Sequence, residues 1–134
     1  MTELWYSQLI KPSFAPPAWL FGPVWTVLYV IIAITFLRVF YLAYKQTIPR
    51  AVAMPFILNL VFNFAFSPIQ FTLQNNFLAA IDIILVFITL AWAMKSIWPY
   101  SRSLAYWQIP YFLWVSFATV LQLSITLLNT NLGA

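Results

Sequence analysis

Long stretches without any charged side chain dominate this chain. Charge is absent from residues 12–37, 51–81 and 103–134. Each stretch is longer than the roughly 20 apolar residues that cross a bilayer as a helix. Lipid offers the backbone no hydrogen-bond partner, so a spanning segment must satisfy its own N–H and C=O groups. The pattern therefore predicts an all-α integral membrane protein built as a helical bundle.

Short polar and proline-containing segments divide these stretches into four predicted transmembrane helices. Residues 1–16 are expected to form an interfacial arm before the first of them. Pro23 and Pro110 fall inside the first and last helices, where proline bends a helix. Short loops make successive helices antiparallel neighbours, so residues 1–134 are predicted to form a single transmembrane domain. The helices are predicted at approximately 17–44, 50–72, 77–95 and 103–129.

Composition agrees with a membrane protein and excludes several kinds of chemistry. Hydrophobic residues make up 64% of the 134 residues and charged residues 6%, against about 25% charged in soluble domains. The chain has no Cys and no His, which excludes Cys/His zinc sites, His-ligated haem and Ser-His catalysis. No cofactor is expected. The net charge of +4 comes from six scattered basic residues, so no nucleic-acid binding is expected.

The distribution of basic residues predicts how the chain is oriented in the membrane. Lys45 and Arg50 flank the first predicted loop, and Lys95 and Arg102 flank the third, whereas the second loop carries no charge. Lys and Arg are enriched in cytoplasmic loops. The first and third loops are therefore predicted to face the cytoplasm, which leaves both termini on the non-cytoplasmic side. Lys11 mildly opposes this orientation.

Three of the predicted helices carry polar residues at helical spacing. The stripes consist of Asn59, Asn63, Ser67 and Gln70 in the second helix, Asp82 and Thr89 in the third, and Thr119, Gln122, Thr126 and Asn129 in the fourth. Polar groups in a lipid-embedded helix face the bundle or a cavity. Two interpretations follow: hydrogen bonds that join packed helices, or a ligand pocket that these groups line.

Asp82 is the one acidic residue inside a predicted span. A carboxylate at membrane depth suggests a functional site. It also lies within two turns of the predicted start of its helix, where the helix dipole and interfacial water stabilise an anion. Both interpretations stay open, and no second carboxylate is available for paired acid–base chemistry.

Aromatic residues are abundant, with seven Trp, seven Tyr and thirteen Phe. Phe21, Trp25 and Tyr29 share one face of the first helix, since they are spaced by four. Packing and an interfacial aromatic belt explain most such residues. Trp25 and Tyr29 lie deeper than a belt, so for them a pocket wall is an equal alternative.

Three blocks of the sequence closely resemble one family, the TspO/MBR family of bacterial tryptophan-rich sensory proteins and the mitochondrial translocator protein. The first block carries Trp5, Tyr6, Lys11, Pro12, Phe14, Pro16, Pro17, Trp19, Phe21, Gly22, Pro23, Trp25 and Tyr29. The second carries Leu60, Phe62, Asn63, Phe66, Ser67, Pro68 and Phe71, followed by Asp82. The third carries Pro110, Tyr111, Trp114, Phe117, Ala118, Thr119 and Leu121, then Asn129.

The resemblance implies a helical bundle whose pocket opens toward one membrane face beneath the loop at residues 5–17. Members of this family bind porphyrins, cholesterol-like lipids and benzodiazepine-type drugs, and they form homodimers. On the matched positions, Trp25 is implied as the pocket tryptophan of the first helix. Asn63 and Phe66 are implied from the second helix, and Ala118 and Leu121 from the fourth.

The sequence also departs from the family pattern. The family has five spans, and the span expected before Trp5 is missing from this sequence. Phe66 stands where the family usually has Trp, Gln122 where it has Asn, and Gln70 where it has an aromatic residue. The Tyr and basic residue of the family's cholesterol motif are absent after Leu121, which puts sterol binding in doubt.

The function expected first is a membrane receptor or sensor for a planar hydrophobic ligand, a porphyrin or other tetrapyrrole, held between aromatic walls. The alternatives are a light-dependent porphyrin-degrading enzyme acting through Trp19 and Trp25, or a transporter of tetrapyrrole or lipid working as a dimer. The expected partners are this ligand, membrane lipid and a second copy of the chain. The candidate ligand-binding residues are Trp19, Phe21, Trp25, Tyr29, Asn63, Phe66, Asp82, Trp114, Ala118, Leu121 and Gln122.

Overall fold

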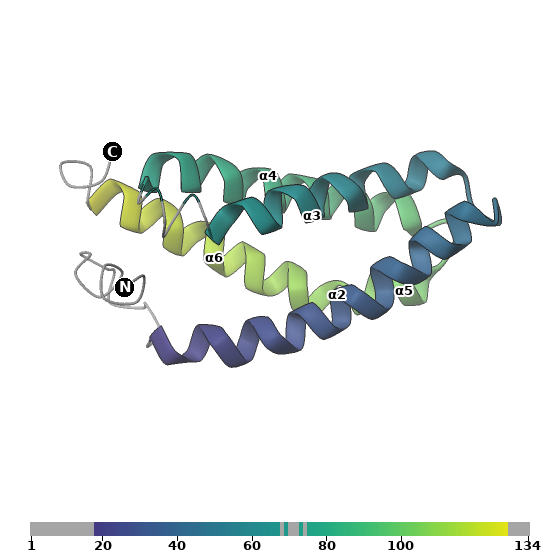
Figure 1. Ribbon diagram of the computed structural model, residues 1–134, viewed down its shortest axis with the longest axis horizontal. Coiled ribbons are helices and arrows are strands. Elements are labelled where there is room, and N and C mark those ends of the chain that lie inside the picture. Colours follow the sequence, from purple (N-terminus) through teal and green to yellow (C-terminus); the bar gives the residue numbers. More distant parts are fainter. Residues whose placement is uncertain (1–17, 68, 70–72, 74, 129–134) are drawn as a thin grey trace.

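The computed structural model describes residues 18–67, 69, 73 and 75–128. The predicted interfacial arm over residues 1–16 lies outside them, as does Asn129. The described residues form helices joined by short connections (Figure 1). In chain order the elements are η1 (Ala18–Leu20), α2 (Phe21–Tyr44), η2 (Arg50–Val52), α3 (Ala53–Ser67), α4 (Asn76–Ile97), α5 (Arg102–Trp107) and α6 (Ile109–Leu128).

Three of the described segments are long and apolar enough to cross a membrane: Gly22–Tyr44, Asn76–Ile97 and Arg102–Leu128. A shorter apolar helix, Arg50–Phe66, lies between the first two. The start of α2 and the end of α6 lie at the same end of the molecule (Figure 1). These features confirm the predicted all-α membrane bundle.

The second and fourth predicted helices each have a proline within their range, Pro68 and Pro110. The second was predicted to continue to residue 72; the α-helix that the structure gives covers Ala53–Ser67, and residues 68, 70–72 and 74 lie outside the described part. The fourth was predicted over 103–129 with a bend at Pro110, and the structure gives α5 and α6 there, separated at Gln108. Pro110 lies two residues after Gln108, and its ring lacks the N–H that would continue the helical hydrogen bonds.

Local sequence signals account for the other helix boundaries. Pro23 lies in the first turn of α2, where its missing N–H is tolerated. At the other end of α2, Gln46 has a φ of 60°, and the amide of Thr47 donates to the carbonyl of Leu42 at 3.0 Å. This pairing is the Schellman ending of a helix. Asn75 caps α4 by accepting a hydrogen bond from the amide of Leu78 at 3.0 Å.

The helices pack around α4. Most of the close backbone approaches between long helices are those of α4 with α3 and with α6, and α4 runs beside both in Figure 1. α2 approaches α3, η2 and α5 less extensively. It joins the core through Phe36, whose ring meets Phe56 of α3 edge-on at 4.8 Å and lies 6.4 Å from Tyr111 of α6. The divergence of α2 from α6 leaves room for the site described next.

Candidate ligand-binding site

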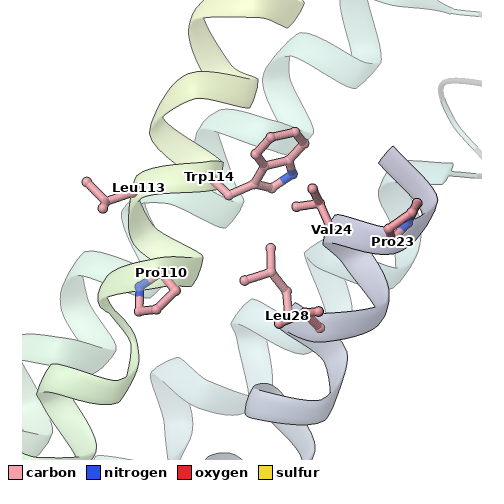
Figure 2. Close-up of a pocket in the computed structure, with 7 residues that line it drawn as sticks. Pro23, Val24, Leu28, Pro110, Leu113 and Trp114 are labelled. Atoms are coloured by element: carbon pink, nitrogen blue, oxygen red, sulfur yellow. The ribbon is translucent and has the colours of Figure 1, made fainter. Parts of the chain in front are cut away.

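An apolar groove of about 520 Å³ lies between α2 and α6. One wall comes from α2 and the other from α6. Within each wall the residues are three or four positions apart, so they lie on one side of their helix. Figure 2 shows the indole of Trp114 extending from α6 toward Val24 of α2, with Leu28 below it. The lining residues are Pro23, Val24, Val27, Leu28, Pro110, Leu113 and Trp114.

Trp25 and Tyr29 occupy the neighbouring face of α2. Their ring centroids are 5.4 Å apart, and the Trp25 ring also meets Tyr111 of α6 edge-on at 6.5 Å. Tyr29 lies 6.2 Å from the ring of Phe64 on α3. Trp25 therefore lies beside the groove, within a group of aromatic rings that α2, α3 and α6 contribute.

A chain of side-chain hydrogen bonds runs from Tyr29 into the core. The Tyr29 hydroxyl donates to Oδ1 of Asn63 at 3.0 Å, and Nδ2 of Asn63 donates to the Tyr111 hydroxyl at 2.7 Å. The Tyr111 hydroxyl in turn donates to Oδ1 of Asn59 at 2.8 Å. Nδ2 of Asn59 then reaches Oγ1 of Thr89 at 3.2 Å. One continuous chain thus joins α2, α3, α6 and α4.

Three further polar side chains join helices at two places away from this series of hydrogen bonds. Gln122 and Thr126 of α6 both donate to the backbone carbonyl of Asn76 at the start of α4, at 3.4 and 3.0 Å. Gln108, which is fully buried at the break between α5 and α6, donates to Oγ1 of Thr35 in α2 at 2.9 Å. Together with the central chain, these contacts favour the first interpretation of the polar stripes, in which they join helices.

Comparison with known proteins identifies the family. The sequence model of the TspO/MBR family matches residues 1–128. The chain belongs to the TspO/MBR family. The match extends through every described helix, so the resemblance noted in three separate blocks is confirmed across nearly the whole chain.

Several relatives cover most of this TspO/MBR chain. It is 40% identical over 125 residues to the tryptophan-rich protein TspO of Bacillus cereus, and the aligned residues cover 93% of this chain and 80% of that protein. It is 34% identical over 127 residues to the human translocator protein, covering 87% of this chain and 70% of the human one. It is 28% identical to the tryptophan-rich sensory protein of Cereibacter sphaeroides, covering 95% and 78%. The family and the apolar helices together make the chain a multi-pass integral membrane protein.

The structure distributes the candidate ligand-binding residues over several places. Trp114 lines the groove, and Trp25, Tyr29 and Asn63 form the adjoining cluster. Gln122 and Leu121 are buried in α6, with Gln122 bonded to α4.

The remaining candidates lie apart from the groove lining. Phe66 and Ala118 are half-buried against the core. Trp19 is 71% exposed in η1, and the side chain of Phe21 lies outside what the structure describes. Asp82 is buried in α4, and its Oδ2 has no hydrogen-bond partner among the described residues.

Sequence reasoning missed six of the seven groove residues, all of them aliphatic or proline. Val24 and Leu28 are spaced by four, as are Pro110 and Trp114. That spacing would have marked two faces, but nothing in it says that the faces oppose each other. Thr35 and Gln108 were also missed, although a Gln before a proline inside an apolar helix is a signal worth pursuing.

Proposed function

We propose that this chain is a membrane receptor or sensor that binds a planar hydrophobic ligand, a porphyrin or related tetrapyrrole, in the groove between α2 and α6. The observation that carries the proposal is the apolar groove walled by the Trp114 indole. The relatives named as tryptophan-rich sensory protein and translocator protein support a receptor or sensor role.

The size and chemistry of the groove suit such a ligand. Small-molecule sites are concave, mostly apolar and roughly 300–1,000 Å³ in volume, and this groove measures about 520 Å³. Trp114 offers a flat π-surface for offset stacking on a macrocycle. Val24 and Leu28 supply the opposing aliphatic wall from α2 (Figure 2).

The position of the groove implies that its ligand arrives through the bilayer. Its lining residues belong to two segments that are long and apolar enough to span a membrane. Val27 and Leu113, at 60% and 63% exposed, lie on opposite sides of the groove. A hydrophobic ligand dissolved among the acyl chains would pass between these two side chains.

A pair of matched variants tests this assignment. In Val27→Trp an added indole occupies the groove, whereas in Val30→Trp the same indole projects from an exposed position of α2 outside the lining. Titration of the purified protein with protoporphyrin, followed by the shift of the porphyrin absorbance band, should show at least a tenfold weaker affinity for Val27→Trp. A tenfold change corresponds to about 1.4 kcal/mol. The affinity of Val30→Trp should equal that of the unmodified protein.

Two outcomes would contradict the proposal. One is the absence of any absorbance shift with the unmodified protein at micromolar porphyrin. The other is an equal loss of affinity in Val27→Trp and Val30→Trp, which would move the ligand away from the groove.

We further propose that both termini lie on the non-cytoplasmic side, as the basic loops indicate. The arrangement that supports this is the common end shared by the start of α2 and the end of α6 (Figure 1). The homodimer implied by the family resemblance stays a prediction.

A further inference from the structure

The described basic side chains gather at one end of the bundle. α2 ends there and α4 ends there, while η2 and α5 begin there. η2 approaches both α2 and α4, and α5 approaches the same two helices, so the two connections lie side by side. We call this region the basic end; its residues are Arg38, Lys45, Arg50, Lys95 and Arg102.

No carboxylate of the described residues neutralises the basic end. The chain has two acidic residues, Glu3 and Asp82, and Glu3 lies outside the described part. Asp82 is buried near the opposite end of α4. It precedes Lys95 by thirteen residues, which at 1.5 Å per residue is about 20 Å along the helix axis. Among the described residues, the five cations therefore have no carboxylate beside them.

Aromatic rings hold three of these cations at the surface. The guanidinium of Arg102 lies over the ring of Trp98, 5.1 Å from its centroid. Arg38 and Lys45 lie over the same ring, that of Tyr41, at 5.8 and 5.9 Å. A cation placed over an aromatic face is attracted by its π-electrons. A guanidinium over a ring keeps its own in-plane N–H donors for phosphate oxygens.

The same rings place the basic end at the membrane interface. Trp98, Tyr41 and Tyr106 are exposed, and Tyr106 meets Trp98 edge-on at 5.3 Å. Trp and Tyr collect at the headgroup level of a bilayer. The rings and the cations they hold therefore share the depth at which lipid phosphates lie.

We propose that the basic end is a binding surface for anionic phospholipid headgroups, with Arg102 over Trp98 as its shortest cation–ring contact. The charge of the surface selects anionic over zwitterionic lipid, because each juxtamembrane Lys or Arg is attracted to an anionic leaflet. This surface is separate from the groove between α2 and α6, whose lining is apolar, so the inference does not depend on the proposed ligand.

The test compares lipid association in bilayers. The full chain is reconstituted into phosphatidylcholine vesicles containing spin-labelled phosphatidylglycerol or spin-labelled phosphatidylcholine, and the motionally restricted fraction of each lipid is measured. The unmodified protein should prefer phosphatidylglycerol. Arg102→Gln should reduce that preference by up to about fivefold at low ionic strength. In the triple variant Arg50→Gln, Lys95→Gln, Arg102→Gln, the restricted fraction of phosphatidylglycerol should fall close to that of phosphatidylcholine.

Two further variants separate charge from folding. Leu73→Gln changes an exposed residue of the connection between α3 and α4, remote from the basic end, and should leave the preference unchanged. Arg102→Lys keeps the charge and should retain most of the preference.

Three results would overturn the proposal. The unmodified protein could restrict both lipids equally. The triple variant could keep the full preference for phosphatidylglycerol. Inorganic phosphate could abolish the preference at constant ionic strength, which would make the occupant a soluble anion and not a lipid.

Discussion

The Tyr111 hydroxyl is the centre of the hydrogen-bond chain, and its removal makes a sharp test of what holds the four helices together. It accepts from Asn63 at 2.7 Å and donates to Asn59 at 2.8 Å. Tyr111→Phe deletes this one oxygen and keeps the ring that packs on Trp25 and Phe36. The substitution therefore isolates the polar contribution from the packing contribution.

The expected loss of unfolding free energy follows from these contacts. An interhelical hydrogen bond in a membrane protein contributes about 0.6 kcal/mol on average and up to about 1.7 kcal/mol. Two such bonds disappear, and they leave Asn59 and Asn63, which are 0% and 5% exposed, without that partner. Tyr111→Phe should therefore lower the free energy of unfolding by about 1–3 kcal/mol.

Reversible unfolding by SDS in mixed detergent micelles, followed by circular dichroism, measures this free energy. Tyr106→Phe is the matched control, because Tyr106 is exposed and packs on Trp98 at the protein surface. A double-mutant cycle of Tyr111→Phe with Asn63→Leu should show positive coupling, since both changes break the same bond. If Tyr111→Phe loses no more unfolding free energy than Tyr106→Phe, the hydrogen-bond chain does not hold the helices together and its assigned role is refuted.

Two more predictions concern the attachment of α2 and the orientation of the protein. Thr35→Val removes the acceptor of the 2.9 Å bond from buried Gln108 and should lower the unfolding free energy by about 1 kcal/mol. Among the described residues, the Thr26 hydroxyl bonds within its own helix, to the carbonyl of Gly22. Thr26→Val should therefore have a smaller effect, and equal losses would show that the bond between helices contributes nothing. Because the chain has no Cys, a single introduced cysteine reports the side of the membrane on which it lies. In intact cells, Thr47→Cys should resist an impermeant maleimide and Leu73→Cys should react. The reverse pattern would invert the proposed orientation.

Much of the architecture could be predicted from the one-dimensional pattern. Runs without charge longer than a bilayer-spanning helix allow little besides helices, because lipid forces backbone groups to pair internally. The spacing of Asn59 and Asn63 placed both on one face, and both prove to be buried toward the bundle. The quoted motifs around Trp25, Asn63 and Trp114 identified the family without any coordinates.

The contacts between faces could not be predicted. Asn63 could have lined a pocket, but in the fold it bonds Tyr29 and Tyr111, from helices on either side of it in the chain. Gln122 lies against the start of α4, away from the groove.

The groove itself is also a tertiary feature. Val24 and Leu113 resemble any lipid-facing residue in the sequence, because lipid tails are as apolar as a protein core. In a soluble protein, polarity separates the inner from the outer face of a helix, but around Val24 and Leu113 both faces are apolar. Only the angle at which α2 departs from α6 determines which aliphatic side chains line a cavity and which face the membrane.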